Sequence, residues 1–246
     1  MNTLSRREAL HIGATAAALA LPLGAAAIED GGKKAKVLVA GGHPDDPESG
    51  CGGLIALYTA SGHEVVNLYL TRGEAGIPGK THAEAAAIRT AEAEAACRVL
   101  GARARFAGQV DGATEVNAAQ YDVVREIMGE ESPDIVYTHW PIDTHRDHRA
   151  MSYLIYDAWL KKGREFELFY FEVESGVQTQ HFSPAHYIDI STVEAKKREA
   201  CYLHESQRPD GFYGLHSEMH AFRGREGGCR LAEGFIRHKL NRSALS

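Results

Sequence analysis

The sequence predicts a single α/β domain with a Rossmann-like, three-layer architecture and a mostly parallel sheet. Short apolar runs that fit buried strands alternate with longer helical segments through the first two thirds of the chain. This alternation is typical of βαβ units, which place helices on both faces of a parallel sheet. The 246 residues suffice for one such domain, and no internal repeat or linker divides them.

Each expected element has a local signal. Strands are expected where short, mostly apolar runs lie between turn residues, at 36–40, 64–70, 103–106, 133–138, 167–173 and 186–190. Helices are expected from 54 to near Gly62 and at 82–100, 117–129, 147–160, 192–204 and 231–240. The second helix is rich in Ala, Glu and Arg and stops at Gly101, and Asn117 is a suitable N-cap for the third.

Residues 1–27 have the pattern of an export signal. Arg6 and Arg7 form a basic start that resembles a twin-arginine signal, an apolar run follows, and Ala25 to Ala27 offer a cleavage site. The apolar run is too short and too rich in alanine for a good membrane span. We therefore expect a periplasmic or extracellular protein with a mature domain at 28–246 and no stable membrane span after cleavage. A frayed basic helix or an uncleaved anchor is the alternative.

Composition and missing motifs argue against several classes of protein. The formal net charge of -6 does not favour a nucleic-acid partner. None of the four cysteines belongs to a CxxC pair, which argues against a disulfide framework and a four-thiolate zinc site, although a single bridge stays open. A nucleotide-binding module is disfavoured because the chain has no GxGxxG or GKS/GKT, and carboxylates follow the first strand where a phosphate would sit.

The groups suited to catalysis concentrate in two segments. Residues 42–48 (GHPDDPE) directly follow the first expected strand, and residues 139–148 (HWPIDTHRDH) directly follow the fourth. Ligands of open α/β sheets bind at the carboxyl ends of the strands. Both segments lie at such ends, so we expect them to converge although they are far apart in sequence.

The two segments contain a set of side chains suited to a catalytic metal. His43 and Asp46 lie three residues apart on a turn, and His148 from the second segment would complete a set of two imidazoles and one carboxylate. Three protein ligands and an open position for water are the arrangement of catalytic zinc, which lowers the pKa of the bound water to about 7. Asp45 adjoins a ligand yet stays free, so it could accept a proton from that water.

Other polar residues of the second segment could assist the reaction. His145 could donate a hydrogen bond to an oxyanion, and Asp147 or Asp143 could fix the tautomer of a neighbouring imidazole. The plainer interpretation is that the Asp pair only caps a helix and that a lone histidine is structural. We apply that interpretation to His63, His82, His181 and His238. Four histidines stay open, namely His139, His204, His216 and His220.

At these residues the sequence resembles the PIG-L/LmbE family of zinc-dependent N-deacetylases. The His-Pro-Asp-Asp motif at 43–46 is followed by Gly52-Gly53, and the His-x-Asp-His motif stands at 145–148. Weaker matches at 70–76, at 189–207 and at 232–235 extend the resemblance over about residues 35 to 238. Some relatives carry Glu where this chain has Pro47, with Glu48 one position later; that position is not a ligand, so we expect little effect on catalysis.

The resemblance implies a function and a role for each site residue. It implies a Zn²⁺ ion held by His43, Asp46 and His148, with Asp45 as the general base. It implies that His145 stabilises the oxyanion or acts as a protonated acid, supported by Asp147, and that Arg72 binds hydroxyl or anionic groups of the substrate. The expected substrate is a small molecule or glycan with an N-acetylated sugar, such as N-acetylglucosamine. The alternatives are hydrolysis of a non-sugar N-acyl substrate and an inactive zinc-binding relative.

Overall fold

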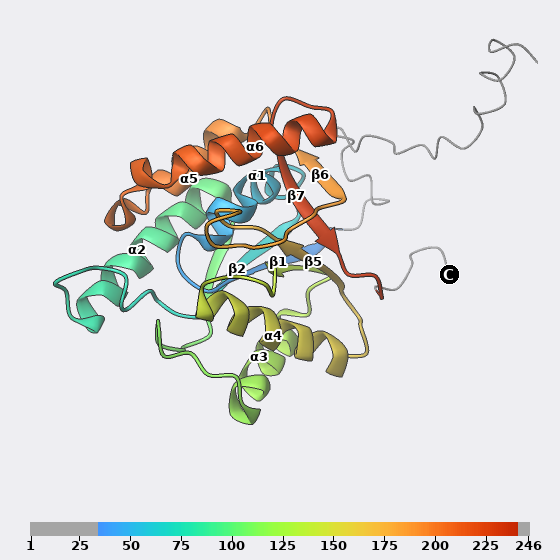
Figure 1. The fold of residues 1–246 in the computed structure, drawn as a ribbon. Helices are drawn as coiled ribbons and strands as arrows, with labels where there is room; N and C mark the ends of the chain where they lie inside the picture. Colours follow the sequence, from blue (N-terminus) through green and yellow to red (C-terminus); the bar gives the residue numbers. More distant parts are fainter. Residues whose placement is uncertain (1–33, 241–246) are drawn as a thin grey trace, which may run out of the picture.

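Seven strands form one sheet in the order β3-β2-β1-β4-β5-β7-β6 in the computed structural model, which describes residues 34–240 (Figure 1). Their bounds are β1 Lys36–Gly41, β2 Glu64–Tyr69, β3 Arg103–Phe106, β4 Ile135–His139, β5 Glu167–Phe171, β6 His186–Asp189 and β7 Ala232–Arg237. Strands β3, β2, β1, β4 and β5 run parallel, whereas β7 is antiparallel to both β5 and β6. The expected export signal at 1–27 lies outside the described residues and stays a prediction.

Six α-helices cover the two faces of the sheet, so the three-layer prediction is confirmed. They are α1 Asp46–Ala60, α2 His82–Leu100, α3 Ala118–Glu131, α4 Arg146–Lys161, α5 Glu194–Tyr202 and α6 Tyr213–Gly227. Figure 1 shows α3 and α4 on one face and α1, α2, α5 and α6 on the other. Each face has its own apolar cluster, with Met151 and Trp159 from α4 in one and Leu54 and Ile55 from α1 in the other. Burial of these side chains is the main force that fixes the helices on the sheet.

The limits of α2 follow from local sequence. Thr81 accepts a hydrogen bond from the backbone N–H of Glu84, and the Glu84 carboxylate accepts one from the N–H of Thr81, so the two form a capping box. At the other end Gly101 adopts φ 78°, the left-handed conformation that ends many helices. The prediction of a helix over 82–100 is therefore confirmed to the residue.

Two expectations about the C-terminal third are wrong. Residues 231–240 do not form a helix, because 232–237 form β7, which pairs with strands on both sides. The apolar residues at 231, 235 and 236 follow helical spacing, but sheet pairing outweighs this local pattern. Helix α6 was not expected at all. Its buried face carries His216, His220 and Arg223 in place of apolar residues, so it has no helical hydrophobic pattern.

Helix α1 begins eight residues before its expected start, so it includes the glycine-rich segment. A Cβ at Gly50 would lie 2.5 Å from the Phe171 ring, and one at Gly53 would lie 2.3 Å from Ile190. These glycines let α1 pack closely against the strand and loop beneath it. The helix itself begins at Asp46, after the N-cap Asp45.

The cysteines and the helices give two further observations. All four cysteines lie within the described residues and are free thiols, and burial raises the pKa of the Cys97 thiol to about 12.

No helix within residues 34–240 combines the length and apolar character needed to cross a membrane.

A buried carboxylate ties α3 to the neighbouring strands. Glu131 is only 4% exposed, and its carboxylate lies 2.9 Å from Lys36 Nζ, 2.7 Å from Arg103 Nη2 and 2.6 Å from Arg105 Nη1. Burial alone would raise the pKa of Glu131, but hydrogen bonds from these three cations lower it to about 2. The ionised carboxylate therefore stabilises the folded state.

We predict that Glu131→Gln lowers the free energy of unfolding by about 1–2 kcal/mol at pH 7, because three partly exposed cations lose their anion. A depressed pKa contributes stability that is complete above the ordinary value of 4.5 and disappears as the pH falls toward 2. Thermal unfolding of both proteins at pH 7 and pH 3 should therefore show a smaller difference at pH 3. The exposed Glu199→Gln is the control. An equal difference at both pH values would contradict the assignment.

Candidate active site

The two polar segments meet where β1 and β4 lie side by side. The chain leaves β1 toward β2 on one side and leaves β4 toward β5 on the other, so the sheet has its topological switch point between them. Ligands of open α/β sheets bind at such a point. The ring centroids of His43 and His148 are 5.3 Å apart, and those of His43 and His145 are 4.5 Å apart. The predicted convergence is therefore observed.

Asp46 lies between the imidazoles. Its Oδ2 is 3.3 Å from His43 Nδ1, and its Oδ1 is 3.3 Å from His148 Nε2. The backbone N–H of His43 also donates to Oδ2, over 2.7 Å. Burial alone would raise the pKa of Asp46, but the nearby His148 and His139 lower it well below its usual range. Asp46 is therefore a buried, ionised carboxylate.

The surroundings of His148 favour positive charge. Burial alone would lower the pKa of His148, but the carboxylates of Asp46 and Asp143 raise it to about 9. His148 Nδ1 lies 3.2 Å from Asp143 Oδ1, so a carboxylate faces each ring nitrogen. An electrostatic field that favours a proton on this ring also favours a metal cation beside it.

Within residues 34–240, three sets of three side chains could each share an ion. In each set the candidate ligand atoms lie within 4.8 Å of one another, and the sets are His43-His145-His148, Asp46-His139-His148 and His43-Asp111-Asp147. The predicted ligands His43, Asp46 and His148 are divided between the first two sets, which share His148. Zinc bonds of about 2.0–2.1 Å place neighbouring tetrahedral ligands roughly 3.3 Å apart. Each contact of Asp46 with a histidine matches that spacing, but the two contacts use different oxygens of Asp46, and no single set contains all three predicted ligands. Imidazole and carboxylate donors of the kind found in the first two sets are those that zinc prefers.

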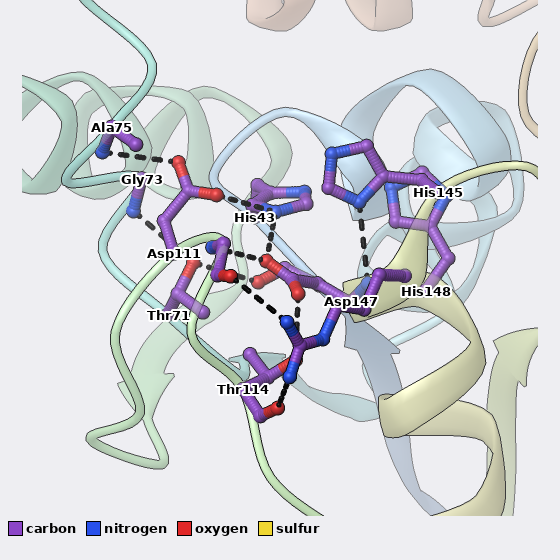
Figure 2. A network of polar contacts seen from close by, with 12 residues as sticks. His43, Thr71, Gly73, Ala75, Asp111, Thr114, His145, Asp147 and His148 are labelled. Atoms are coloured by element: carbon purple, nitrogen blue, oxygen red, sulfur yellow. Dashed lines mark hydrogen bonds and ion pairs between the residues drawn. The ribbon is translucent and has the colours of Figure 1, made fainter.

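Two carboxylates face the other nitrogen of His43. Its Nε2 lies 3.1 Å from Asp147 Oδ2 and 3.3 Å from Asp111 Oδ1, and Figure 2 shows both groups directed at the ring. Thr114 Oγ1 donates to Asp147 over 2.6 Å and holds it in place. Carboxylates in this position commonly orient a metal-binding imidazole. The Asp147 carboxylate therefore acts on His43, whereas the resemblance placed it in support of His145.

His145 is the N-cap of α4, and its ring contacts the backbone of the first turn of that helix. The backbone N–H of Asp147 lies 3.3 Å from His145 Nδ1 and donates to it (Figure 2). Burial, with His43 next in effect, lowers the pKa of His145, so the ring is neutral near neutral pH. Because Nδ1 accepts a hydrogen bond, the ring proton is assigned to Nε2, which is free to donate.

Asp45 adjoins the metal-binding candidates without belonging to any of the three sets. Burial raises the pKa of its carboxyl to about 6, although Arg89 opposes the shift. Arg89 Nη2 donates to Asp45 Oδ2 over 3.2 Å and to the Pro44 carbonyl over 2.5 Å. The guanidinium therefore fixes both the side chain and the preceding backbone of Asp45.

These groups line a cavity of about 430 Å³. His43, Asp45, Asp46, His145 and His148 border it on one side. Residues from α2, from the loops and from α6 border it elsewhere, including Arg89, Asp111, Gln178, Gln207, Phe212 and His216. The cavity thus joins a cation-binding cluster to a wall rich in hydrogen-bonding groups.

Of the site residues expected from the sequence, Arg72 alone does not border the cavity or touch the cluster. Its Nη1 donates to Thr90 Oγ1 over 2.8 Å, and its guanidinium lies 4.1 Å from the centre of the Phe106 ring. Arg89 borders the cavity instead. A signal for Arg89 exists in the sequence, because it lies four residues from both Ala85 and Ala93 on the buried face of α2, where an arginine needs a partner.

Two histidines left open by the sequence belong to the site. His139, the last residue of β4, stacks on His148 with a centroid distance of 3.9 Å, and its Nε2 lies 3.2 Å from Asp46 Oδ2. Burial, followed by the effect of His148, lowers the pKa of His139 to about 4. His216 borders the cavity from α6, a helix that the sequence did not predict.

The chain is similar to known deacetylases. The profile of the PIG-L family, described as GlcNAc-PI de-N-acetylase, matches residues 38–159, which include both polar segments. A diacetylchitobiose deacetylase from Thermococcus kodakarensis is 32% identical over 219 residues, covering 81% of this chain and 81% of the relative.

Solved structures with the same fold include the following examples. An N,N'-diacetylchitobiose deacetylase from Pyrococcus horikoshii, in complex with an inhibitor, has a TM-score of 0.73 and 26% identity over 82% of this chain and 83% of its own. The 4-carboxy-2-hydroxymuconate hydratase GalB from Pseudomonas putida KT2440 has a TM-score of 0.74 over 86% of this chain and 98% of its own, and its 21% identity shows the fold alone. The profile match and the 32% identical relative confirm the resemblance: the chain belongs to the PIG-L family of metal-dependent N-deacetylases.

Proposed function

We propose that this protein is a zinc-dependent hydrolase that removes the acetyl group from an N-acetylated sugar or sugar conjugate. The observation that carries the proposal is the Asp46 carboxylate, 3.3 Å from both His43 and His148 at the border of a cavity of about 430 Å³. The substrate class is supported by the diacetylchitobiose deacetylase that is 32% identical to the chain.

His43, Asp46 and His148 would hold the zinc. When bound, zinc polarises an amide carbonyl and lowers the pKa of a water molecule to about 7. Asp147 and Asp111 hold the His43 ring from its other side, at 3.1 Å and 3.3 Å, so the ligand is oriented in advance.

Asp45 and His145 supply the proton transfer and the charge stabilisation. Asp45 accepts a proton from the attacking water, a role for which a carboxyl pKa of about 6 is well matched near neutral pH. His145 donates its Nε2–H to the oxygen of the tetrahedral intermediate, since its Nδ1 is engaged by the N–H of Asp147. Proton transfer to the nitrogen then releases acetate and an amine.

The remainder of the cavity suits a polyhydroxylated substrate. Arg89, Asp111, Gln178 and Gln207 offer charged and amide groups along it, and Phe212 adds an aromatic ring. Sugar hydroxyls both donate and accept hydrogen bonds, so this mixture of donors and acceptors can pair with them. A purely apolar acyl amine could not form additional hydrogen bonds with these groups.

Zinc affinity should identify the ligands. We expect Asp46→Asn, His43→Ala and His148→Ala each to weaken zinc binding by more than about 100-fold, measured by competition with a chromophoric chelator. Gln178→Ala is the matched control, since Gln178 borders the same cavity but belongs to none of the three sets, so this variant should keep one zinc per chain. If His139→Gln lost zinc and His43→Ala kept it, the ligands would instead be Asp46, His139 and His148.

The general base is tested by Asp45→Asn. This variant should retain zinc and a near-normal KM but lose about 10²–10⁴-fold in kcat, because the water no longer has a base. Steady-state acetate release together with metal analysis measures both properties. Arg72→Gln is the control, and its kcat should stay near that of the wild type. Full activity in Asp45→Asn would show that another group accepts the proton.

The substrate class is tested by acetate release from a panel. N,N'-diacetylchitobiose and N-acetylglucosamine should give kcat/KM at least about 10-fold higher than an N-acetylated alkylamine of similar size, because the polar wall lacks partners in the latter. Equal rates would favour a general N-acyl hydrolase. A zinc-loaded protein that releases no acetate from any compound would favour an inactive relative.

A further inference from the structure

The backbone of Asp45 is held in a conformation that residues other than glycine rarely adopt. Its φ is 106° and its ψ is -28°, and it is the N-cap of α1. Such conformations cost of order 1–3 kcal/mol and persist only where the surroundings impose them. Contacts with neighbouring groups, and not the intrinsic backbone preference of aspartate, therefore hold the proposed general base in this conformation.

The group that engages this backbone is the carboxylate of Glu48. Its Oε2 accepts the backbone N–H of Asp45 over 3.2 Å. Its Oε1 accepts from Tyr69 Oη over 2.6 Å and from Asn67 Nδ2 over 2.8 Å, both on β2. His204 Nε2 lies 3.4 Å from Oε2. Glu48 thus links the first turn of α1 to the sheet and to the segment that follows α5.

Glu48 is fully buried, and a carboxylate in such a position needs hydrogen-bond partners. The N–H of Asp45, the Tyr69 hydroxyl and the Asn67 amide donate to its two oxygens. A buried carboxylate is costly unless its oxygens are satisfied. Glu48 belongs to none of the three candidate metal sets found among residues 34–240, and it does not border the cavity. Its charge therefore serves neither zinc nor substrate directly.

An ordinary helix cap does not account for this arrangement. The capping box of α2 also has a glutamate at its third helical position, with Glu84 accepting the N–H of the N-cap Thr81 over 2.9 Å. There the capping residue has an unstrained φ of -69°, and Glu84 is exposed. At α1 the same bond engages a strained residue, and its carboxylate is buried and bound to β2. Capping alone therefore does not explain why Glu48 is buried, why it is bound to β2, and why it contacts a strained residue.

We propose that Glu48 is a positioning residue for the general base: it anchors the backbone of Asp45 in the left-handed conformation that directs the carboxylate to Arg89 and the cavity. Arg89 holds the other end, since it donates to Asp45 Oδ2 over 3.2 Å. Asp45 is thus fixed through its N–H by Glu48 and through its side chain by Arg89. This inference rests on the proposed role of Asp45.

The test compares Glu48→Ala, Glu48→Gln and the matched control Glu84→Ala. Glu48→Ala should lower kcat for deacetylation by about 10–100-fold, with zinc content unchanged and KM within about threefold, because displacing a catalytic group by about 1 Å has effects of this size. Glu48→Gln should recover most of the kcat, since its amide oxygen still accepts the Asp45 N–H. Glu84→Ala should lower only the Tm.

A double variant separates positioning from general stability. If Glu48 acts through Asp45, then Asp45→Asn/Glu48→Ala should be no slower than Asp45→Asn alone. Independent multiplication of the two losses would overturn the proposal, as would a folded Glu48→Ala with wild-type kcat. Should Glu48→Ala fail to fold, Tyr69→Phe removes one bond to Glu48 and should lower kcat by a smaller factor; a wild-type kcat there would also overturn it. Full activity of Asp45→Asn would instead refute the proposed function.

Discussion

The parallel pairing of β1 with β4 is the constraint on which the site depends. In this register Ala40 lies beside Thr138, so the residues that follow each strand emerge side by side. The backbone N–H of Gly42 donates to His139 Nε2 over 3.0 Å and joins the two strand ends directly. Every candidate metal ligand found among residues 34–240 comes from the end of β4, from the segments that follow β1 and β4, or from the loop after β3. The position of the cluster is therefore a property of the sheet.

The cluster concentrates buried charge that is balanced only as a unit. Asp46, Asp143 and Asp147 are almost fully buried, and histidines are their nearest positive or polarisable partners. Each carboxylate is costly alone, and the neighbouring imidazoles offset that cost. The same arrangement that lowers the pKa of Asp46 also raises the pKa of His148. Such opposite shifts in adjacent groups are typical of sites built for chemistry.

The sequence predicted what depends on short-range pattern. The strands of the parallel core, the limits of α2 and the convergence of both polar segments follow from apolar runs, caps and the geometry of βαβ units. Prediction from the sequence failed where tertiary contacts determine the secondary structure. Residues 232–237 became a strand because β5 and β6 flank them, and α6 has a polar buried face. Arg89 and His216 reach the cavity from helices, so no motif beside the catalytic segments includes them.

The cavity is assembled from two stretches of chain, one inside the match to the family profile and one beyond it. The family profile ends at residue 159, before β5, whereas Glu174, Gln178, Gln207, Phe212 and His216 all come later. The reactive centre thus belongs to one stretch and most of the opposing wall to another. A hydratase with the same fold shows that the scaffold does not dictate the reaction. We therefore expect substitutions beyond β5 to change substrate specificity while the proposed metal ligands and general base stay unchanged.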